Sequence, residues 1–94
     1  MAAMQFEWDE NKRLANAAKH GIDFRDAVAI WEGPVLEIPS PQSEEQRWLA
    51  IGRMNGRIVA VVFVRRGGRI RIISARGTRQ YEREAYEEAV RQKS

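Results

Sequence analysis

Nine arginines and no acidic residue lie between positions 47 and 79 of this 94-residue chain. A guanidinium group is planar and carries several N–H donors, so it can hold a phosphate through two hydrogen bonds or stack on a base. A surface that is only solvated usually mixes both signs of charge. The arginine run therefore indicates a surface that binds a polyanion. Its members are Arg47, Arg53, Arg57, Arg65, Arg66, Arg69, Arg71, Arg76 and Arg79.

The charge is unevenly divided along the sequence. Residues 1–46 contain 4 Lys or Arg and 9 Asp or Glu, a net charge of −5, whereas residues 47–94 contain 12 Lys or Arg and 4 Glu, a net charge of +8. The overall charge of +3 is the difference between an acidic and a basic half. This asymmetry leaves a second interpretation open, in which the arginines form surface ion pairs with acids between residues 7 and 45.

Composition excludes several classes of site. The chain has no cysteine and one histidine, which rules out disulfides and leaves too few ligands for a structural zinc site. We expect no metal and no cofactor. No apolar run approaches 18 residues, and the N-terminus, Met1-Ala2-Ala3-Met4, lacks the basic and apolar regions of a signal peptide. These features predict a cytoplasmic protein that does not bind membranes.

The elements that must position the arginines can be read from periodicity and turn residues. The first third predicts a strand over residues 5–8, a helix from the N-cap Asp9 to Gly21, and a second helix that Asp23 caps and Gly33-Pro34 ends. Asn55-Gly56 and Gly67-Gly68 are tight-turn signals that separate three strands. The remaining elements are strands over residues 35–38, 47–53, 57–66 and 69–76, and a helix that Thr78 caps and that runs to about Val90.

The predicted order is β-α-α-β-β-β-β-α. It indicates one small α+β domain over residues 1–94, with helices packed on one face of a mainly antiparallel sheet. Strict alternation in the last strand places Arg76 on the face of Ile70 and Ile72, and Arg71 on the opposite face. Most of the other arginines fall at strand ends, which suits a shallow groove able to hold several phosphates.

Two groups of residues resemble the motifs of the BrnT toxin family. The similarity runs from about residue 6 to residue 88, and the pieces are specific when taken together, in order and at their spacing. The opening group is Phe6-Glu7-Trp8-Asp9, Lys12, Asn16, Lys19-His20-Gly21 and Asp23-Phe24. The closing group is Ile72-Ile73-Ser74-Ala75-Arg76, Thr78-Arg79, Glu82 and Tyr86.

The resemblance implies a type II toxin with a fold similar to RelE-type ribonucleases. It implies cleavage of mRNA without a metal and arrest of translation. The implied partner is an antitoxin of the BrnA type, which has a ribbon-helix-helix domain and forms a hetero-oligomer with the toxin. A toxin dimer is compatible with this picture. The pair would repress its own operon, so operator DNA would be contacted only through the antitoxin.

Metal-free RNA cleavage requires a base for the 2′-hydroxyl, an acid for the leaving 5′-oxygen and cations for the pentacoordinate phosphate. His20 titrates near neutrality when unperturbed, so it could be the acid or the base, with Lys19 beside it. Alternatively, both complement the dipole at a helix C-terminus. Glu44 or Glu45, just before Arg47, could act as the base or be a loop charge.

The catalytic candidates are thus His20, Lys19, Glu45, Arg65 and Arg76, and the candidates for binding RNA phosphates are Arg47, Arg71 and Arg79. The sequence contains no clear acid–base pair. A non-catalytic RNA- or protein-binding module that uses the arginine-rich sheet is therefore the alternative function. It would bind RNA in a salt-sensitive way and leave the RNA intact.

Overall fold

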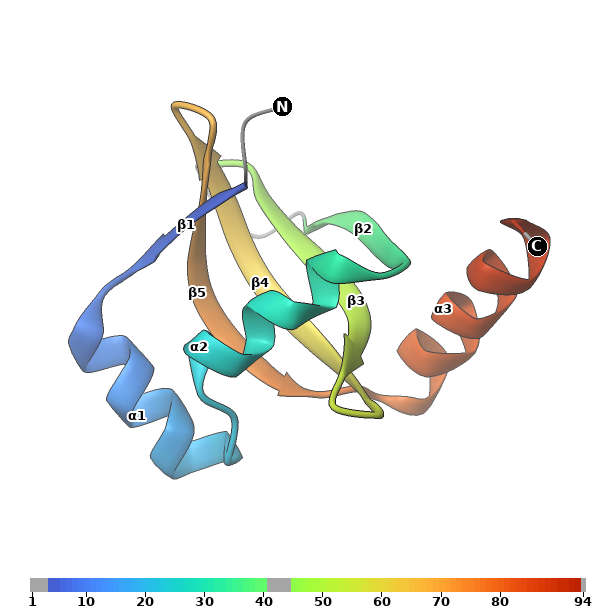
Figure 1. Cartoon of the computed structure of the whole chain (residues 1–94), viewed down its shortest axis with the longest axis horizontal. Helices are drawn as coiled ribbons and strands as arrows, with labels where there is room; N and C mark the ends of the chain where they lie inside the picture. The colour runs from blue at the N-terminus through green and yellow to red at the C-terminus, as the bar shows by residue number, and fades with distance from the viewer. Residues whose placement is uncertain (1–3, 41–44, 94) are drawn as a thin grey trace.

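The computed structural model describes residues 4–40 and 45–93, which form a five-stranded sheet flanked by helices (Figure 1). The strands lie in the order β1-β5-β4-β3-β2, with β1 parallel to β5 and the other pairs antiparallel. The predicted α+β fold is confirmed. The elements are β1 (Gln5–Trp8), α1 (Glu10–His20), α2 (Phe24–Ala27), the 3-10 helix η1 (Val28–Glu32), β2 (Val35–Ser40), β3 (Arg47–Met54), β4 (Arg57–Arg66), β5 (Arg69–Gly77) and α3 (Gln80–Lys93).

Two tight turns connect the central strands and determine where many arginines lie. Asn55 and Gly56 have φ angles of 52° and 80°, and Gly67 and Gly68 have φ angles of 55° and 80°. Positive φ at both turn residues matches the twist of the flanking strands, and glycine and asparagine adopt it at low cost. Both predicted turns are confirmed, and arginines flank each of them at opposite ends of the sheet.

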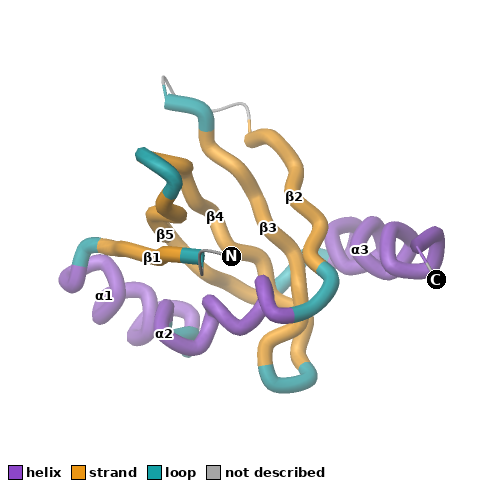
Figure 2. The backbone as a smooth tube through the Cα atoms, turned by 45° about the horizontal axis from the view of Figure 1, so that its top comes forward, coloured by secondary structure: helices purple, strands orange, loops and turns teal. Residues whose placement is uncertain are grey.

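The sheet has two different faces. The closed face carries Val59, Val61 and Phe63, which pack in the main core with residues of α2 and η1. The open face carries Ile51 and Ala60, which pack with Tyr86 of α3 in a smaller cluster. The partly buried residues around this cluster are Leu36, Leu49, Ile58 and Val90. Figure 2 shows α3 at one end of the sheet, beside β2 and β3. The expected packing of helices on one face holds for α2 and η1, whereas α3 lies against the open face and leaves much of it uncovered.

An irregularity in β5 changes which side chains share a face. Val62 pairs with Ser74 and Phe63 pairs with Ile72, so Ile73 is an extra residue, a β-bulge. Beyond the bulge the alternation is shifted by one position. Arg76, opposite Ala60, therefore points to the open face together with Arg71. The prediction that these two arginines lie on opposite faces is wrong.

A buried asparagine completes the edge of β5. β1 pairs with β5 only as far as Ile72. Further along, the Asn16 side chain of α1 takes over: its Nδ2 donates to the Ala75 carbonyl at 2.9 Å, and its Oδ1 accepts the Ala75 N–H at 3.1 Å. Nδ2 also donates to the Ile22 carbonyl at 2.9 Å. One amide side chain thus joins α1, the following turn and the strand that carries Arg76.

Replacing Asn16 with alanine should lower the free energy of unfolding by about 2–3 kcal/mol, because it leaves three buried backbone groups without partners. Urea unfolding followed by circular dichroism measures the loss. Asn11→Ala is the matched control, since Asn11 is exposed on the same helix and should cost less than about 0.5 kcal/mol. Equal losses in the two variants would contradict this role.

Candidate functional site

A groove lies between the first turns of α3 and the uncovered part of the open face. Its floor is apolar, and its wall carries two arginines and a glutamate. It measures about 450 Å³, a size within the range of pockets that accept small organic groups. The lining residues are Ile38, Pro39, Ser40, Leu49, Val62, Arg76, Arg79, Tyr81, Glu82 and Ala85.

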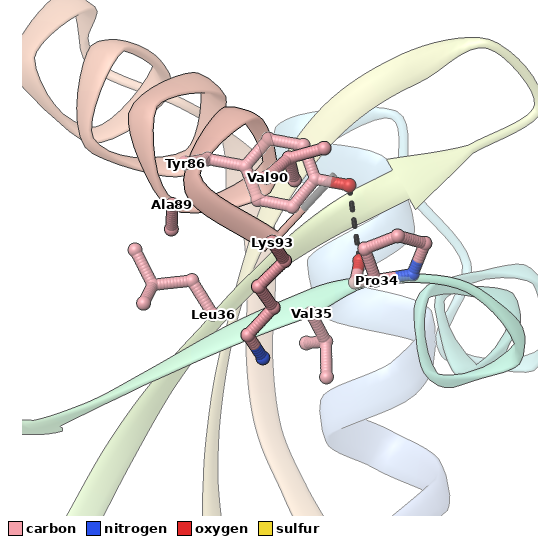
Figure 3. A pocket seen from close by; sticks show the side chains of 7 residues that line it. All are labelled: Pro34, Val35, Leu36, Tyr86, Ala89, Val90 and Lys93. Carbon is pink, nitrogen blue, oxygen red and sulfur yellow. Dashed lines mark hydrogen bonds between the residues drawn. The ribbon is translucent and has the colours of Figure 1, made fainter.

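Packing of α3 on β2 sets the width of this groove. Tyr86 is 2% exposed, and its hydroxyl donates to the Pro34 carbonyl at 3.0 Å (Figure 3). The ring lies with Leu36, Ala89 and Val90 at the joint between helix and strand. Because the hydroxyl is satisfied and the ring is buried, this joint is structural.

The Arg76 guanidinium joins β5 to α3. Nη1 and Nη2 donate to the two carboxylate oxygens of Glu82, each at 2.8 Å, and Glu82 is 3% exposed. Glu82 Oε1 also accepts the Arg79 N–H at 2.8 Å. The hydrogen bonds from Arg76 lower the pKa of Glu82 below its ordinary value of 4.5, against the opposite effect of burial. Arg76 therefore positions the helix, with two of its N–H groups committed to Glu82.

The N-cap of α3 differs from the expectation by one residue. Arg79, rather than Thr78, supplies the carbonyl that accepts the first helical N–H groups, from Glu82 and Arg83. Thr78 instead donates its hydroxyl to the Ile58 carbonyl at 3.4 Å. The Glu82 side chain binds the N–H of the N-cap residue three positions earlier, which is one half of a capping box. The role of Glu82 could not be read from the sequence as a capping box, because the N-cap residue is an arginine and not a serine or threonine.

A second group of charges lies at the other end of the open face. Glu45 accepts from Arg66 Nε at 3.0 Å and from Nη2 at 2.9 Å. The hydrogen bonds from Arg66 lower the pKa of Glu45, and the charges of Arg66, Arg47 and Arg71 add to the effect. Glu45 is thus ionised and held by Arg66, so it can accept a proton but cannot donate one near neutrality.

Acids of the first half neutralise several arginines. Arg71 Nη1 donates to Glu7 at 2.7 Å, and Arg69 is 3.9 Å from the other Glu7 oxygen. The second interpretation of the sequence, surface ion pairing, therefore applies to Arg65, Arg66, Arg69 and Arg71. Such partly exposed pairs near the surface contribute little, about 1 kcal/mol each, so a strong anion can displace the carboxylate.

Arg65 lies apart from these groups. It pairs in register with Ile70 and shares the closed face with Phe63. Its guanidinium stacks over the rings of Phe63 and Trp48, with its central carbon 5.1 Å and 5.6 Å from their centroids, and donates to Glu37 at 2.7 Å. The sheet therefore separates Arg65 from Arg71 and Arg76, and the structure does not bring the three together.

Lys19 and His20 end α1, and both side chains are exposed. Gly21 closes the helix with φ of 70°, and its N–H donates to the Ala17 carbonyl. Within residues 4–40 and 45–93, no hydrogen bond or ion pair joins Lys19 or His20 to the arginines of the open face. Their geometry agrees with the interpretation that they complement the helix dipole. Glu44, the other carboxylate considered as a base, lies outside the described residues.

Comparison with known proteins decides the family. Residues 8–82 match the model of the family described as "Ribonuclease toxin, BrnT, of type II toxin-antitoxin system". The chain belongs to the BrnT family. Its structure is similar to the crystal structure of the Brucella abortus ribonuclease toxin, BrnT, with a TM-score of 0.63 and 36% sequence identity over 83% of this chain and 100% of that chain. A search of curated proteins gives no match.

The family match confirms the resemblance read from the motifs. A BrnT chain is a ribonuclease toxin of a type II system, which implies an RNA substrate and an antitoxin partner. Within the described part of the chain, no three His, Cys, Asp or Glu side chains cluster so that they could hold a metal ion. No helix among these residues is long and apolar enough to cross a membrane.

Replacing Arg76 with glutamine should lower the free energy of unfolding by about 3 kcal/mol, because it leaves the buried Glu82 carboxylate without its charged partner. Arg79→Gln is the control, since the Arg79 guanidinium donates only to the Tyr81 hydroxyl among the described residues, and we expect a loss below about 0.5 kcal/mol. Urea unfolding of both variants measures the difference. A loss in Arg76→Gln no larger than in the control would contradict the positioning role.

The cost of Arg76→Gln should also depend on pH. Because the pKa of Glu82 is lower in the folded state, the pair contributes stability above about pH 4.5, and this contribution is lost as the pH falls through the folded-state pKa. The difference in unfolding free energy between wild type and variant should therefore be largest near pH 7 and shrink at about pH 3. A difference that stays constant from pH 7 to pH 3 would contradict the coupling.

Proposed function

We propose that this chain is a metal-independent endoribonuclease that cleaves mRNA in the cytoplasm and arrests translation, with residues 1–94 acting as a single toxin domain. One observation carries the proposal: Arg66 holds the Glu45 carboxylate through two hydrogen bonds at the end of the open face, where the charges of Arg47 and Arg71 also act on it. The family of ribonuclease toxins to which the chain belongs supports RNA as the substrate.

RNA binding would proceed by exchange of anions. Arg71 and Arg66 hold carboxylates of Glu7 and Glu45 at 2.7 and 2.9 Å, in pairs that are partly exposed. A phosphodiester can accept two N–H groups from a guanidinium, so replacing a weak ion pair with a bound phosphate costs little. Arg47 forms no ion pair within 4.0 Å with any described residue, so its guanidinium is available to a phosphate from the start.

Exchange at Arg66 would also prepare the base. When a phosphate takes the Arg66 donors, the cause of the low Glu45 pKa is removed, and that pKa rises toward its ordinary value of 4.5. Glu45 then becomes a stronger base for the 2′-hydroxyl, next to arginines that stabilise the pentacoordinate phosphate. The donor to the leaving 5′-oxygen remains a prediction, with His20 and Lys19 as candidates, and so does a catalytic role for Arg65.

Purified protein should cleave a 5′-labelled RNA in the presence of EDTA. Glu45→Gln should reduce the rate about 100-fold, within the usual contribution of a general base, and Arg71→Gln should reduce it by removing a cation from the reacting phosphate. Gel analysis of the products measures both rates. Glu32→Gln is the control for Glu45, because Glu32 is exposed at the end of η1.

Three results would contradict the proposal. They are a requirement for added metal, wild-type cleavage by Glu45→Gln, and cleavage that survives the combined replacement of Arg47, Arg66 and Arg71. Induced expression of the active chain should also stop growth of a host cell, and expression of Glu45→Gln should not.

A non-catalytic binding module is the second candidate. It is favoured by the state of Glu45, whose carboxylate is held by Arg66 through two hydrogen bonds that lower its pKa and so make it a weaker base. This alternative predicts salt-dependent binding of RNA and intact RNA after long incubation. The cleavage assay above distinguishes it from the toxin mechanism.

The proposed partner is an antitoxin of the BrnA type with a ribbon-helix-helix domain, forming a hetero-oligomer that reaches operator DNA only through the antitoxin. Acidic residues of that partner can replace Glu7 and Glu45 on the open face, as RNA phosphates do. A short reading frame beside the gene that encodes a ribbon-helix-helix protein would support this assignment. Co-expression of the two chains should yield one complex that does not cleave RNA.

A further inference from the structure

Three arginines that the candidate site does not include converge at the end of the sheet beneath α3. Arg53 and Arg57 flank the Asn55-Gly56 turn between β3 and β4, and Arg83 lies in the second turn of α3. All three are exposed, and they line one hollow of about 330 Å³ with Gly56, Ile58, Gly77 and Thr78. We propose that this hollow is a second subsite for RNA phosphate and binds the continuation of the RNA strand held on the open face. This inference rests on the proposed function.

The two strand arginines approach the hollow from opposite faces of the sheet. Arg53 pairs in register with Ile58, and both belong to the open face. Arg57 alternates with Val59 and lies on the closed face, beside Gly77. A Cβ atom at Gly77 would lie 2.9 Å from Arg57 Nη2, so the glycine provides the space in which this guanidinium rests. The hollow thus wraps around the end of the sheet.

The arginines of this hollow, unlike the ion-paired arginines of the open face, are not paired with carboxylates among the described residues. In residues 4–40 and 45–93, Arg53, Arg57 and Arg83 form no ion pair within 4.0 Å and no hydrogen bond through their guanidinium groups. Arg53 also borders a neighbouring hollow with Glu87 and Arg91, yet no ion pair forms between Arg53 and Glu87. Three like charges around one space repel one another, and an anion in that space removes the repulsion.

The position of the hollow favours a continuing RNA strand. Thr78 lines it, and the next residue, Arg79, lines the groove of the candidate site. The two spaces therefore meet at the junction between β5 and α3. A chain with a phosphate on every nucleotide can reach both, and guanidinium groups hold phosphates through paired N–H donors. The same charges could instead receive acidic side chains of a protein, which the experiment distinguishes.

The test measures binding of a 20-nucleotide, 2′-O-methyl RNA, which lacks the attacking hydroxyl and stays intact. Fluorescence anisotropy at several salt concentrations gives the dissociation constant and its salt slope. The combined variant Arg53→Gln, Arg57→Gln, Arg83→Gln should lower the slope by about 2, since each phosphate contact on a single strand contributes about 0.7. At 0.1 M salt this corresponds to a Kd that is about 100-fold larger.

A matched variant controls for net charge. Lys12→Gln, Arg25→Gln, Arg91→Gln removes the same three charges from exposed positions outside the hollow and should change the slope by less than about 0.5. Circular dichroism and Tm should be unchanged in the hollow variant, because its three arginines have no partners to lose among the described residues. The control variant loses the surface ion pairs of Arg25 with Asp23 and of Arg91 with Glu88, so its circular dichroism spectrum should be unchanged while its Tm falls slightly.

The outcomes separate this inference from the proposed function. Wild-type binding and cleavage of RNA, with equal slopes in the two triple variants, would overturn the subsite and leave the proposed function intact. Absence of both RNA binding and RNA cleavage in the wild type would overturn the proposed function. If the hollow variant binds RNA as the wild type does but loses binding to an acidic peptide, the hollow is a protein-binding site and the inference is wrong.

Discussion

One extra residue in β5 determines how the two ends of this fold are connected. Because Ile73 is bulged, Ala75 faces the core, and its backbone N–H and carbonyl form hydrogen bonds with Asn16. Arg76 then points to the open face, where it forms an ion pair with Glu82. Without the bulge, Arg76 would point into the apolar core of the closed face, where a charge is costly to bury. The same shift therefore anchors α1 on one side of the strand and α3 on the other, and it defines the wall of the groove.

The unequal charges of the two halves have a structural meaning. Acids of the first half reach across to arginines of the second: Glu7 to Arg71, Glu37 to Arg65 and Glu45 to Arg66. These pairs reduce the repulsion between neighbouring arginines in the free protein. Because they are partly exposed, another anion can replace their carboxylates at low cost. The Arg76–Glu82 pair differs because its carboxylate is buried. Breaking this pair would leave the Glu82 carboxylate without a charged partner and without hydrating water, which is strongly destabilising. The arginine run therefore contains two populations, one that can exchange its partner and one that holds the fold.

Much of the fold could be predicted from the sequence, because its signals are local. Asn55-Gly56 and Gly67-Gly68 specify tight turns by their backbone freedom, and the apolar run in β4 specifies a central strand. Less of the site could be predicted. Glu45 was correctly associated with the arginines because it is close to Arg47 in sequence. The separation of Arg65 from Arg71 and the occupation of Arg76 by Glu82 depend on the register between strands and on where α3 docks, which no local pattern reports.

The sequence by itself determined the composition of the surface: a basic second half, turns that place arginines at both ends of the sheet, and the motifs of the BrnT family. Only the tertiary structure decided which arginines work together. A side chain alternates between faces with every residue, so a single bulge reverses the assignment of every position beyond it. For the same reason the nine arginines do not form one site. They divide among an open face with exchangeable carboxylates, the Arg76–Glu82 pair at α3, a stacked Arg65 on the closed face and a hollow without carboxylate partners in the described chain. Arg79 lines the groove and donates to Tyr81.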